Sequence, residues 1–225
     1  LEREVNLALT GNFDLSVALQ RLRAARAVTR REASDLFPDL NGFADIGHTI
    51  QPGRNQTRTT WGLDASYQVD LWGQIQARVD AEQFRADATD ADYHAVALSL
   101  AAEVARTWFA LIESYAQLEL LDEQLKSNRQ GQKNVELRFA TGGSGGSPDV
   151  LRQRQLVQST LEQVIVVKAN IEVLEHQLAV LTGQPPQTAT YSPGSDFPDL
   201  PPLPATGLPS DLLNRRPDVR RDYLA

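Results

Sequence analysis

The longest stretch of this chain without glycine or proline runs from Gln74 to Gln130. Nothing in it interrupts an α-helix, because Gly and Pro are the residues that most disfavour a helix interior. Its apolar residues recur every seven positions, as is typical of a coiled coil. They are Ala97, Val104, Leu111, Leu118 and Leu125, with a second set four residues on at Ala101, Trp108 and Tyr115. A helix from Gln74 to Phe139 would be about 100 Å long, which is too long for a globular domain of this mass.

A second long helix is predicted after a glycine and serine run from Thr141 to Pro148, with Asp149 placed to cap it. Its repeat is Val150, Val157, Val164, Ile171 and Leu178, completed by Val167, Leu174 and Leu181 and, near the run, by the polar Gln153 and Thr160. Two helices joined by a short connection lie antiparallel. The Gly/Ser run itself fits either a natural tight reversal or an introduced flexible linker.

An amphipathic helix is also predicted from Asp14 to about Phe37, ending at Pro38. Its apolar positions are Leu15, Ala18, Leu19, Leu22 and Ala25, and Asn12 or Asp14 can cap its start. The opposite face carries Arg23, Arg26, Arg30 and Arg31, which we interpret as a solvated face.

After Pro38 the period changes to two, which is typical of strands. A first strand runs from Leu40 to Gln51, and a turn-rich stretch from Pro52 to Gln56 follows. The second strand places Trp61, Leu63, Ala65, Tyr67, Val69 and Leu71 on one face and Gly62, Asp64, Ser66, Gln68 and Asp70 on the other. Each run is about as long as a strand that crosses a bilayer.

The apolar face of this hairpin has two interpretations. Periodicity alone favours a soluble hairpin that covers a core. The flanking helices, however, offer no compact layer to cover the sheet, which favours contact with lipid or with another subunit. The aspartates on the polar faces, Asp45, Asp64 and Asp70, could equally line a water-filled lumen or be solvated.

Composition argues against several other functions. The formal net charge of −7 disfavours a nucleic-acid binder, and the lack of Cys excludes thiolate sites and disulfides. The histidines, His48, His94 and His176, sit in separate elements without further metal ligands. With no phosphate-binding loop or nucleophile motif either, we expect no enzyme, no cofactor and no metal. No run approaches the roughly 20 apolar residues of a membrane-spanning helix.

Residues 184–209 hold eight of the twelve prolines and are predicted to form a linker. A new helix signal begins at Leu208, with Pro209, Ser210 and Asp211, and is cut off at Ala225. Because the chain also starts at Leu1 rather than Met, we expect a processed or truncated product. A second copy of the pattern should follow it.

Short motifs spread over nearly the whole chain resemble, in order, those of the outer-membrane efflux channel family typified by TolC and OprM. They are Ala24-Ala25-Arg26-Ala27, Asp35-Leu36-Phe37-Pro38, Asp70-Leu71-Trp72-Gly73, Ala102-Glu103-Val104-Ala105, Arg138-Phe139 with Gly142, Leu181-Thr182-Gly183-Gln184-Pro185, and Leu208-Pro209-Ser210-Asp211-Leu212-Leu213 leading to Arg215-Arg216-Pro217-Asp218-Val219. The chain looks like the first structural repeat of such a channel.

The resemblance implies a mainly α protomer with a β-hairpin, namely antiparallel coiled-coil helices plus two strands of an outer-membrane β-barrel. Residues 1–38 would be a first periplasmic helix, 39–72 the barrel hairpin, 73–183 the long helical hairpin with its reversal at 140–149, 184–209 an equatorial linker, and 210–225 the start of a second repeat. Trp61, Leu63, Ala65, Tyr67, Val69 and Leu71 would face lipid, and Asp64, Ser66, Gln68 and Asp70 the lumen.

For function, the resemblance implies a passive exit duct of a tripartite efflux pump in the Gram-negative outer membrane, with its helices in the periplasm. The native protein would be a trimer, and a lipidated Cys would precede Leu1. The tip residues Arg138, Phe139, Gly142 and Asp149 would dock a periplasmic adaptor protein, which an inner-membrane transporter joins. In this tip Asp149 lies eleven residues after Arg138 rather than the family's ten, and Gly145 holds the place of a serine. The alternative is a soluble periplasmic coiled-coil scaffold or adaptor.

Overall fold

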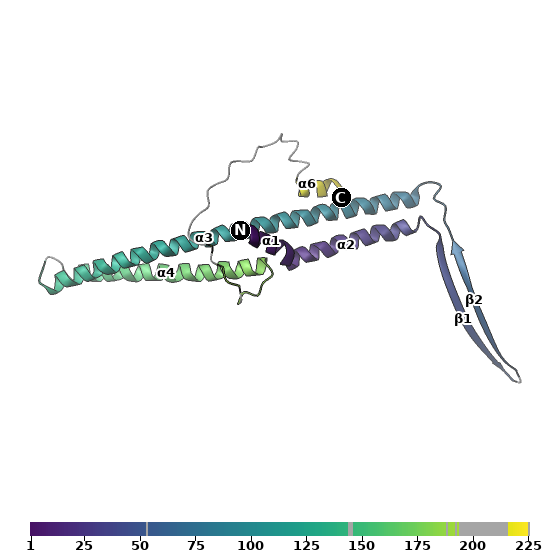
Figure 1. Ribbon diagram of the computed structural model, residues 1–225, viewed down its shortest axis with the longest axis horizontal. Helices are drawn as coiled ribbons and strands as arrows, with labels where there is room; N and C mark the ends of the chain where they lie inside the picture. Colours follow the sequence, from purple (N-terminus) through teal and green to yellow (C-terminus); the bar gives the residue numbers. More distant parts are fainter. Residues whose placement is uncertain (53, 144–145, 188, 192, 194–215, 225) are drawn as a thin grey trace. The chain divides into compact units, whose positions relative to one another are not determined.

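The computed structural model describes residues 1–52, 54–143, 146–187, 189–191, 193 and 216–224. Its elements are α1 (Glu2–Gly11), α2 (Phe13–Ser34), β1 (Asp39–Gln51), β2 (Arg54–Ser66), α3 (Gln74–Ala140), α4 (Ser147–Leu181) and α6 (Pro217–Leu224) (Figure 1). The mainly helical fold with one β-hairpin is thus confirmed, and α3 is the continuous helix that the glycine-free stretch predicts. The Leu208–Leu213 helix signal and most of the proline-rich segment lie outside the described residues.

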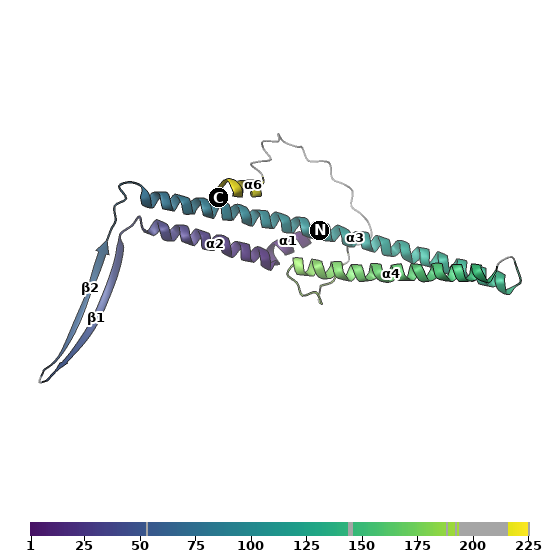
Figure 2. The ribbon, with the colours of Figure 1, turned by 180° about the vertical axis from the view of Figure 1, so that it is seen from behind.

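The chain divides into two compact units, and α3 contributes to both. One comprises residues 1–16 and 96–206, and the other comprises residues 17–95 and 207–225. In the first unit α3 and α4 lie side by side and antiparallel, as both views show (Figures 1 and 2). The α4 repeat is buried as predicted, at Val150, Val157, Val164, Ile171 and Leu178.

The second heptad position that α3 buries in its contact with α4, called here the second seam position, differs from the prediction. It lies three residues after the first, not four. The buried set is Leu100, Thr107, Ser114 and Leu121, whereas Ala101, Trp108 and Tyr115 are only half-buried. The large rings of Trp108 and Tyr115 suggested the wrong phase, because Thr107 and Ser114 are polar and did not look like seam residues.

The polar seam positions are satisfied across the helix pair. The Asn170 side-chain amide donates to Ser114 Oγ at 3.0 Å, and the Asn128 amide donates to Thr160 Oγ1 at 2.9 Å. Buried polar groups are tolerated when they are hydrogen-bonded in this way. Every buried side-chain nitrogen and oxygen in the described part of the chain has a partner.

The helix predicted from Asp14 corresponds to α2. A further helix, α1, precedes it and was not predicted, and Asn12 separates the two. Asn12 is buried and bonds in two directions. Its Oδ1 accepts the Leu15 backbone N–H, and its Nδ2 donates to the Leu181 carbonyl, each at 3.0 Å. The cap of α2 is therefore also tied to the last turn of α4.

In the second unit, α2 packs on the first turns of α3. Ala18 and Leu22 are buried, Thr29 Oγ1 donates to the Glu82 carbonyl at 3.1 Å, and Arg26 pairs with Asp90 at 2.8 Å. α2 ends at Ser34 rather than Phe37. Asp35 to Phe37 instead form a turn in which each backbone N–H donates to the carbonyl three residues earlier.

The hairpin differs from its prediction at both ends of β2. Arg54 already pairs with Gln51, so the turn is shorter than Pro52 to Gln56. β2 ends at Ser66, so Tyr67, Val69 and Leu71 lie beyond it. The alternating pattern continues to Leu71, but ladder pairing stops where β1 begins at Asp39, the partner of Ser66.

Within the described residues, α3 alone contains a window of residues apolar enough to cross a membrane by length and composition. Only 22% of that window is buried. One such helix is weak evidence for a membrane span, and the window belongs to a 67-residue helix, far longer than the roughly 20 residues that a span requires.

Replacing Gly183 with Ala should strongly destabilise the first unit. Gly183 has a φ of +72°, and an added Cβ would lie 2.1 Å from the Gly11 carbonyl oxygen. Gly142 has the same φ but nothing within 4 Å of such a Cβ. We expect Gly142→Ala to cost about 1 kcal/mol and Gly183→Ala more than about 2 kcal/mol, measured by denaturant unfolding followed by circular dichroism. Equal costs would contradict the close packing of Gly11 on Gly183.

Candidate functional site

The β-hairpin presents one apolar face and one polar face. Residues directly opposite one another in an antiparallel pair share a face, and the register pairs Ala44 with Trp61 and Gly42 with Leu63. The apolar face therefore combines both strands: it contains Leu40, Ala44, Ile46, Trp61, Leu63 and Ala65. Trp61 is 80% exposed and Leu63 is 76% exposed, so no described part of this chain covers that face.

The opposite face carries Asn41, Asp45, Thr60, Asp64 and Ser66. Phe43 is its apolar exception, and its ring lies over Gly62, where an added Cβ would come within 2.7 Å of the ring. Of the predicted lumen-facing residues, Asp64 and Ser66 thus share this polar face.

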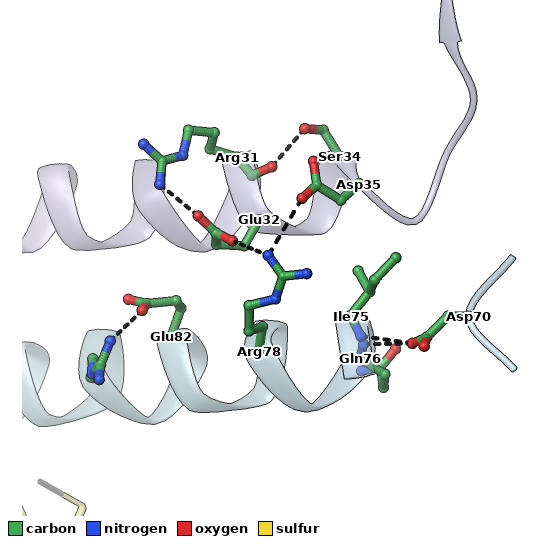
Figure 3. A network of polar contacts seen from close by, with 10 residues as sticks. Arg31, Glu32, Ser34, Asp35, Asp70, Ile75, Gln76, Arg78 and Glu82 are labelled. Atoms are coloured by element: carbon green, nitrogen blue, oxygen red, sulfur yellow. Dashed lines mark hydrogen bonds and ion pairs between the residues drawn. The ribbon is translucent and has the colours of Figure 1, made fainter. Parts of the chain in front are cut away.

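The other two predicted lumen residues, Gln68 and Asp70, lie beyond β2, as do Tyr67, Val69 and Leu71. Asp70 has a structural function. Its carboxylate accepts the backbone N–H groups of Ile75 and Gln76, each at 2.9 Å (Figure 3), and that of Gln74 at 2.7 Å. A carboxylate at a helix N-terminus satisfies orphan donors and complements the helix dipole, so Asp70 fixes the start of α3.

A charged network next to this cap joins the end of α2 to α3 (Figure 3). Arg78 of α3 lies 3.8 Å from Glu32 and 3.9 Å from Asp35, and Arg31 also contacts Glu32. The hydrogen bond from Arg31 lowers the pKa of Glu32. These pairs could not be predicted from the sequence, because they depend on which turns of α2 and α3 meet.

The predicted tip residues lie around the helix reversal. Arg138 and Phe139 are in the last turn of α3, and the Arg138 carbonyl accepts the Gly143 N–H at 2.9 Å while Gly142 adopts a φ of +72°. Asp149 is the third residue of α4 rather than its cap. Its carboxylate reaches back to the Gly146 N–H at 3.1 Å. Residues 144 and 145 lie outside the described residues.

Glu136 links the two helices next to the reversal, and its hydrogen bonds with Arg154 and Gln132 are called here the Glu136 clasp. Its carboxylate accepts hydrogen bonds from Arg154 of α4 at 2.9 Å and from Gln132 at 3.1 Å. The hydrogen bond from Gln132 makes the largest contribution to lowering the pKa of Glu136, and the bond from Arg154 is the next largest. The clasp connects α3 and α4 directly beneath the predicted tip.

Within the described residues, no group of three or more His, Asp or Glu side chains could hold a metal ion. The features that stand out are therefore surfaces: a one-sided apolar hairpin, a capped junction and an exposed reversal.

The profile of the outer membrane efflux protein family matches residues 5–184. This chain belongs to that family. The cation efflux system protein CusC of Escherichia coli K12 is 31% identical over 96% of this chain and 48% of its own length. The pyoverdine export outer membrane protein OpmQ of Pseudomonas putida KT2440 is 28% identical over 97% and 49%.

Solved structures agree on the fold. The outer-membrane channel OprN superposes with a TM-score of 0.85 at 32% identity, covering 99% of this chain and 52% of that one. A CusC crystal structure gives 0.80 at 27% identity, covering 100% and 53%. The chain spans about half the length of the curated relatives that it matches. These relatives are efflux and export proteins, which favours the channel over a soluble scaffold. Family membership places the protein in the outer membrane, with its helical part in the periplasm.

Replacing Asp70 with Ala should destabilise the start of α3. Three backbone donors would lose their acceptor, which typically costs about 1–2 kcal/mol. Asp64→Ala is the matched control, because Asp64 lies on the polar strand face and should change stability by less than about 0.5 kcal/mol. The two variants are compared by denaturant unfolding, and a similar effect from both would contradict the capping role of Asp70.

Lowering the pH should loosen the Glu136 clasp. The pKa of Glu136 in the folded protein is lowered from its ordinary 4.5. Its contribution to stability is therefore fully present above pH 4.5 and is lost as the pH falls through the lower pKa of the folded state. We expect amides near residues 132–136 and 154 to lose protection at acidic pH, where protection is the measured exchange rate compared with the intrinsic rate at the same pH. In Glu136→Gln this local loss of protection should be absent, and its persistence would show that another group titrates.

Proposed function

We propose that this chain is part of the passive outer-membrane channel of an efflux pump. The observation that carries the proposal is the exposed one-sided apolar hairpin in a member of the outer membrane efflux family. Trp61, Leu63 and Ala65 face lipid, and Asp64 and Ser66 face a water-filled lumen. A strand pair with one apolar and one polar face is what a transmembrane barrel requires. The duct carries out no chemical step and supplies no energy.

The native protein associates with itself, as a trimer by family resemblance. Support comes from a second apolar stripe on α4, formed by Val166, Val173 and Val180, which are 60–67% exposed. Val166 follows the buried Val164 by two residues, so it lies about 200° further around the helix, away from the α3 seam. A helix that is apolar on two opposite sides has two helical neighbours in a wall, and α3 is only one of them.

The reversal around Arg138, Phe139, Gly142 and Asp149 docks a periplasmic adaptor protein, and an inner-membrane transporter completes the pump. Phe139 is half exposed at the end of the longest helix, where a partner can reach it. Its ring and the adjacent Arg138 guanidinium are of the kinds enriched at protein interfaces.

Leu63→Asp tests this function, because a charge on the lipid-facing side should make the free energy of membrane insertion less favourable by about 2 kcal/mol. Thr60→Asp is the control on the polar face. In cells that lack their own channel protein, the full-length Leu63→Asp variant should be depleted from the outer-membrane fraction and fail to lower accumulation of a pump substrate. The Thr60→Asp control should reach the outer-membrane fraction and lower accumulation of the substrate. Normal insertion of Leu63→Asp would overturn the proposal.

A further inference from the structure

α4 carries two apolar stripes that are not directly opposite each other. The stripe packed on α3 consists of two rows, one through the buried Val164 and one through the half-buried Val167. At about 100° per residue, the Val167 row lies about 60° from the Val164 row. The exposed stripe through Val166 lies about 100° further in the same direction, whereas about 200° separate it from Val164 in the other direction. The two stripes are therefore closer together on one side of the helix.

The unequal sides of α4 indicate which of them faces the interior of a duct. In a closed ring of helices, the two neighbours of each helix are less than half a turn apart on the inner side and more than half a turn apart on the outer side. The narrow side of α4 carries Gln163, Asn170 and Gln177, and the wide side carries Lys168 and Glu172. All five side chains are exposed. The narrow side therefore has the geometry of the inner side.

Contacts between α3 and α4 show that each side continues onto α3. On the narrow side the Asn170 amide donates to Ser114 Oγ at 3.0 Å, and the Gln177 amide donates to Glu103 at 3.3 Å. On the wide side the Tyr115 hydroxyl donates to Glu175 at 2.9 Å. The helix pair thus presents two distinct surfaces, one on each side of its seam.

The position of Tyr191 supports the same assignment without using the angles. Tyr191 follows α4 and is only 5% exposed. Its hydroxyl is hydrogen-bonded to Thr182 Oγ1 at 3.1 Å, and its carbonyl oxygen lies 3.5 Å from the Tyr115 hydroxyl on the wide side. A connecting segment on the inner side of a ring would obstruct the duct. The side that holds Tyr191 is therefore the outer one.

We infer that the narrow side of the α3–α4 pair lines the interior of the duct, where Gln163, Asn170 and Gln177 present their amides to the molecules that pass. The inference rests on the proposed function, since it assigns the inner surface of the channel. The three residues are one heptad apart and span about 21 Å along α4. Amides donate and accept hydrogen bonds without carrying a charge.

Charged side chains of the same stretch of α4, Lys168 and Glu172, lie on the outer side. Glu103, which accepts the Gln177 bond on the inner side, is paired with Arg106. This row of the duct wall therefore offers hydrogen bonds to polar solutes and does not select them by charge.

The 225 residues contain no Cys, so single cysteines can report which side is enclosed. Gln163→Cys and Gln177→Cys probe the narrow side, and Lys168→Cys and Glu172→Cys are the matched controls on the wide side. Each is introduced into the full-length protein, with any other unmodified Cys replaced by Ser. The purified native assembly is modified with a biotin maleimide that has a short linker, and streptavidin is then added. The small maleimide can enter a duct, whereas streptavidin cannot.

We expect streptavidin to shift the native Lys168→Cys and Glu172→Cys proteins on a gel and to leave Gln163→Cys and Gln177→Cys unshifted. After unfolding in detergent, all four should shift, which shows that each cysteine was modified. Native shifts for the narrow-side pair alone, or for neither pair, would overturn the inference and leave the proposed function standing. Native shifts for all four variants would show that no interior is enclosed, and both the inference and the proposed function would fail.

Discussion

The packing of α4 along α3 is the interaction on which the first unit depends. Burial of the heptad positions where α3 and α4 meet removes an apolar stripe from water over the whole length of α4. Because α3 continues beyond that contact to Gln74, the same helix provides the surface on which α2 packs in the second unit. The N-terminal part of α3 packs against α2, and its C-terminal part packs against α4.

The sequence predicted this arrangement well where apolar residues mark the period. Val104, Leu111 and the valines of α4 are regular enough to identify both helices and their antiparallel pairing. It failed where small polar residues take seam positions, because Thr107 and Ser114 become identifiable only through burial and through partners such as Asn170. It also missed α1, since the break at Asn12 depends on the Leu181 carbonyl, which lies 169 residues away.

For the candidate site, the alternation of side chains predicted the two faces of the hairpin, and the register brings both apolar sets together. The alternation did not predict where pairing stops. Asp70 falls on the polar side of the pattern, but its carboxylate is used by the backbone of α3. Period-two alternation can continue through a segment that has no partner strand, so strand ends depend on the partner and not on the segment itself.

The polar layers of the α3–α4 seam affect how the reversal can vary. A slide of α4 by one heptad in either direction would bring Leu121 opposite Thr160 or Asn170, and would separate the hydrogen-bonded pairs that now match. Alignment of the two helices is therefore maintained by their contact rather than by the connection between them. The connection between Arg138 and Asp149 can therefore change in length while both helices keep their neighbours.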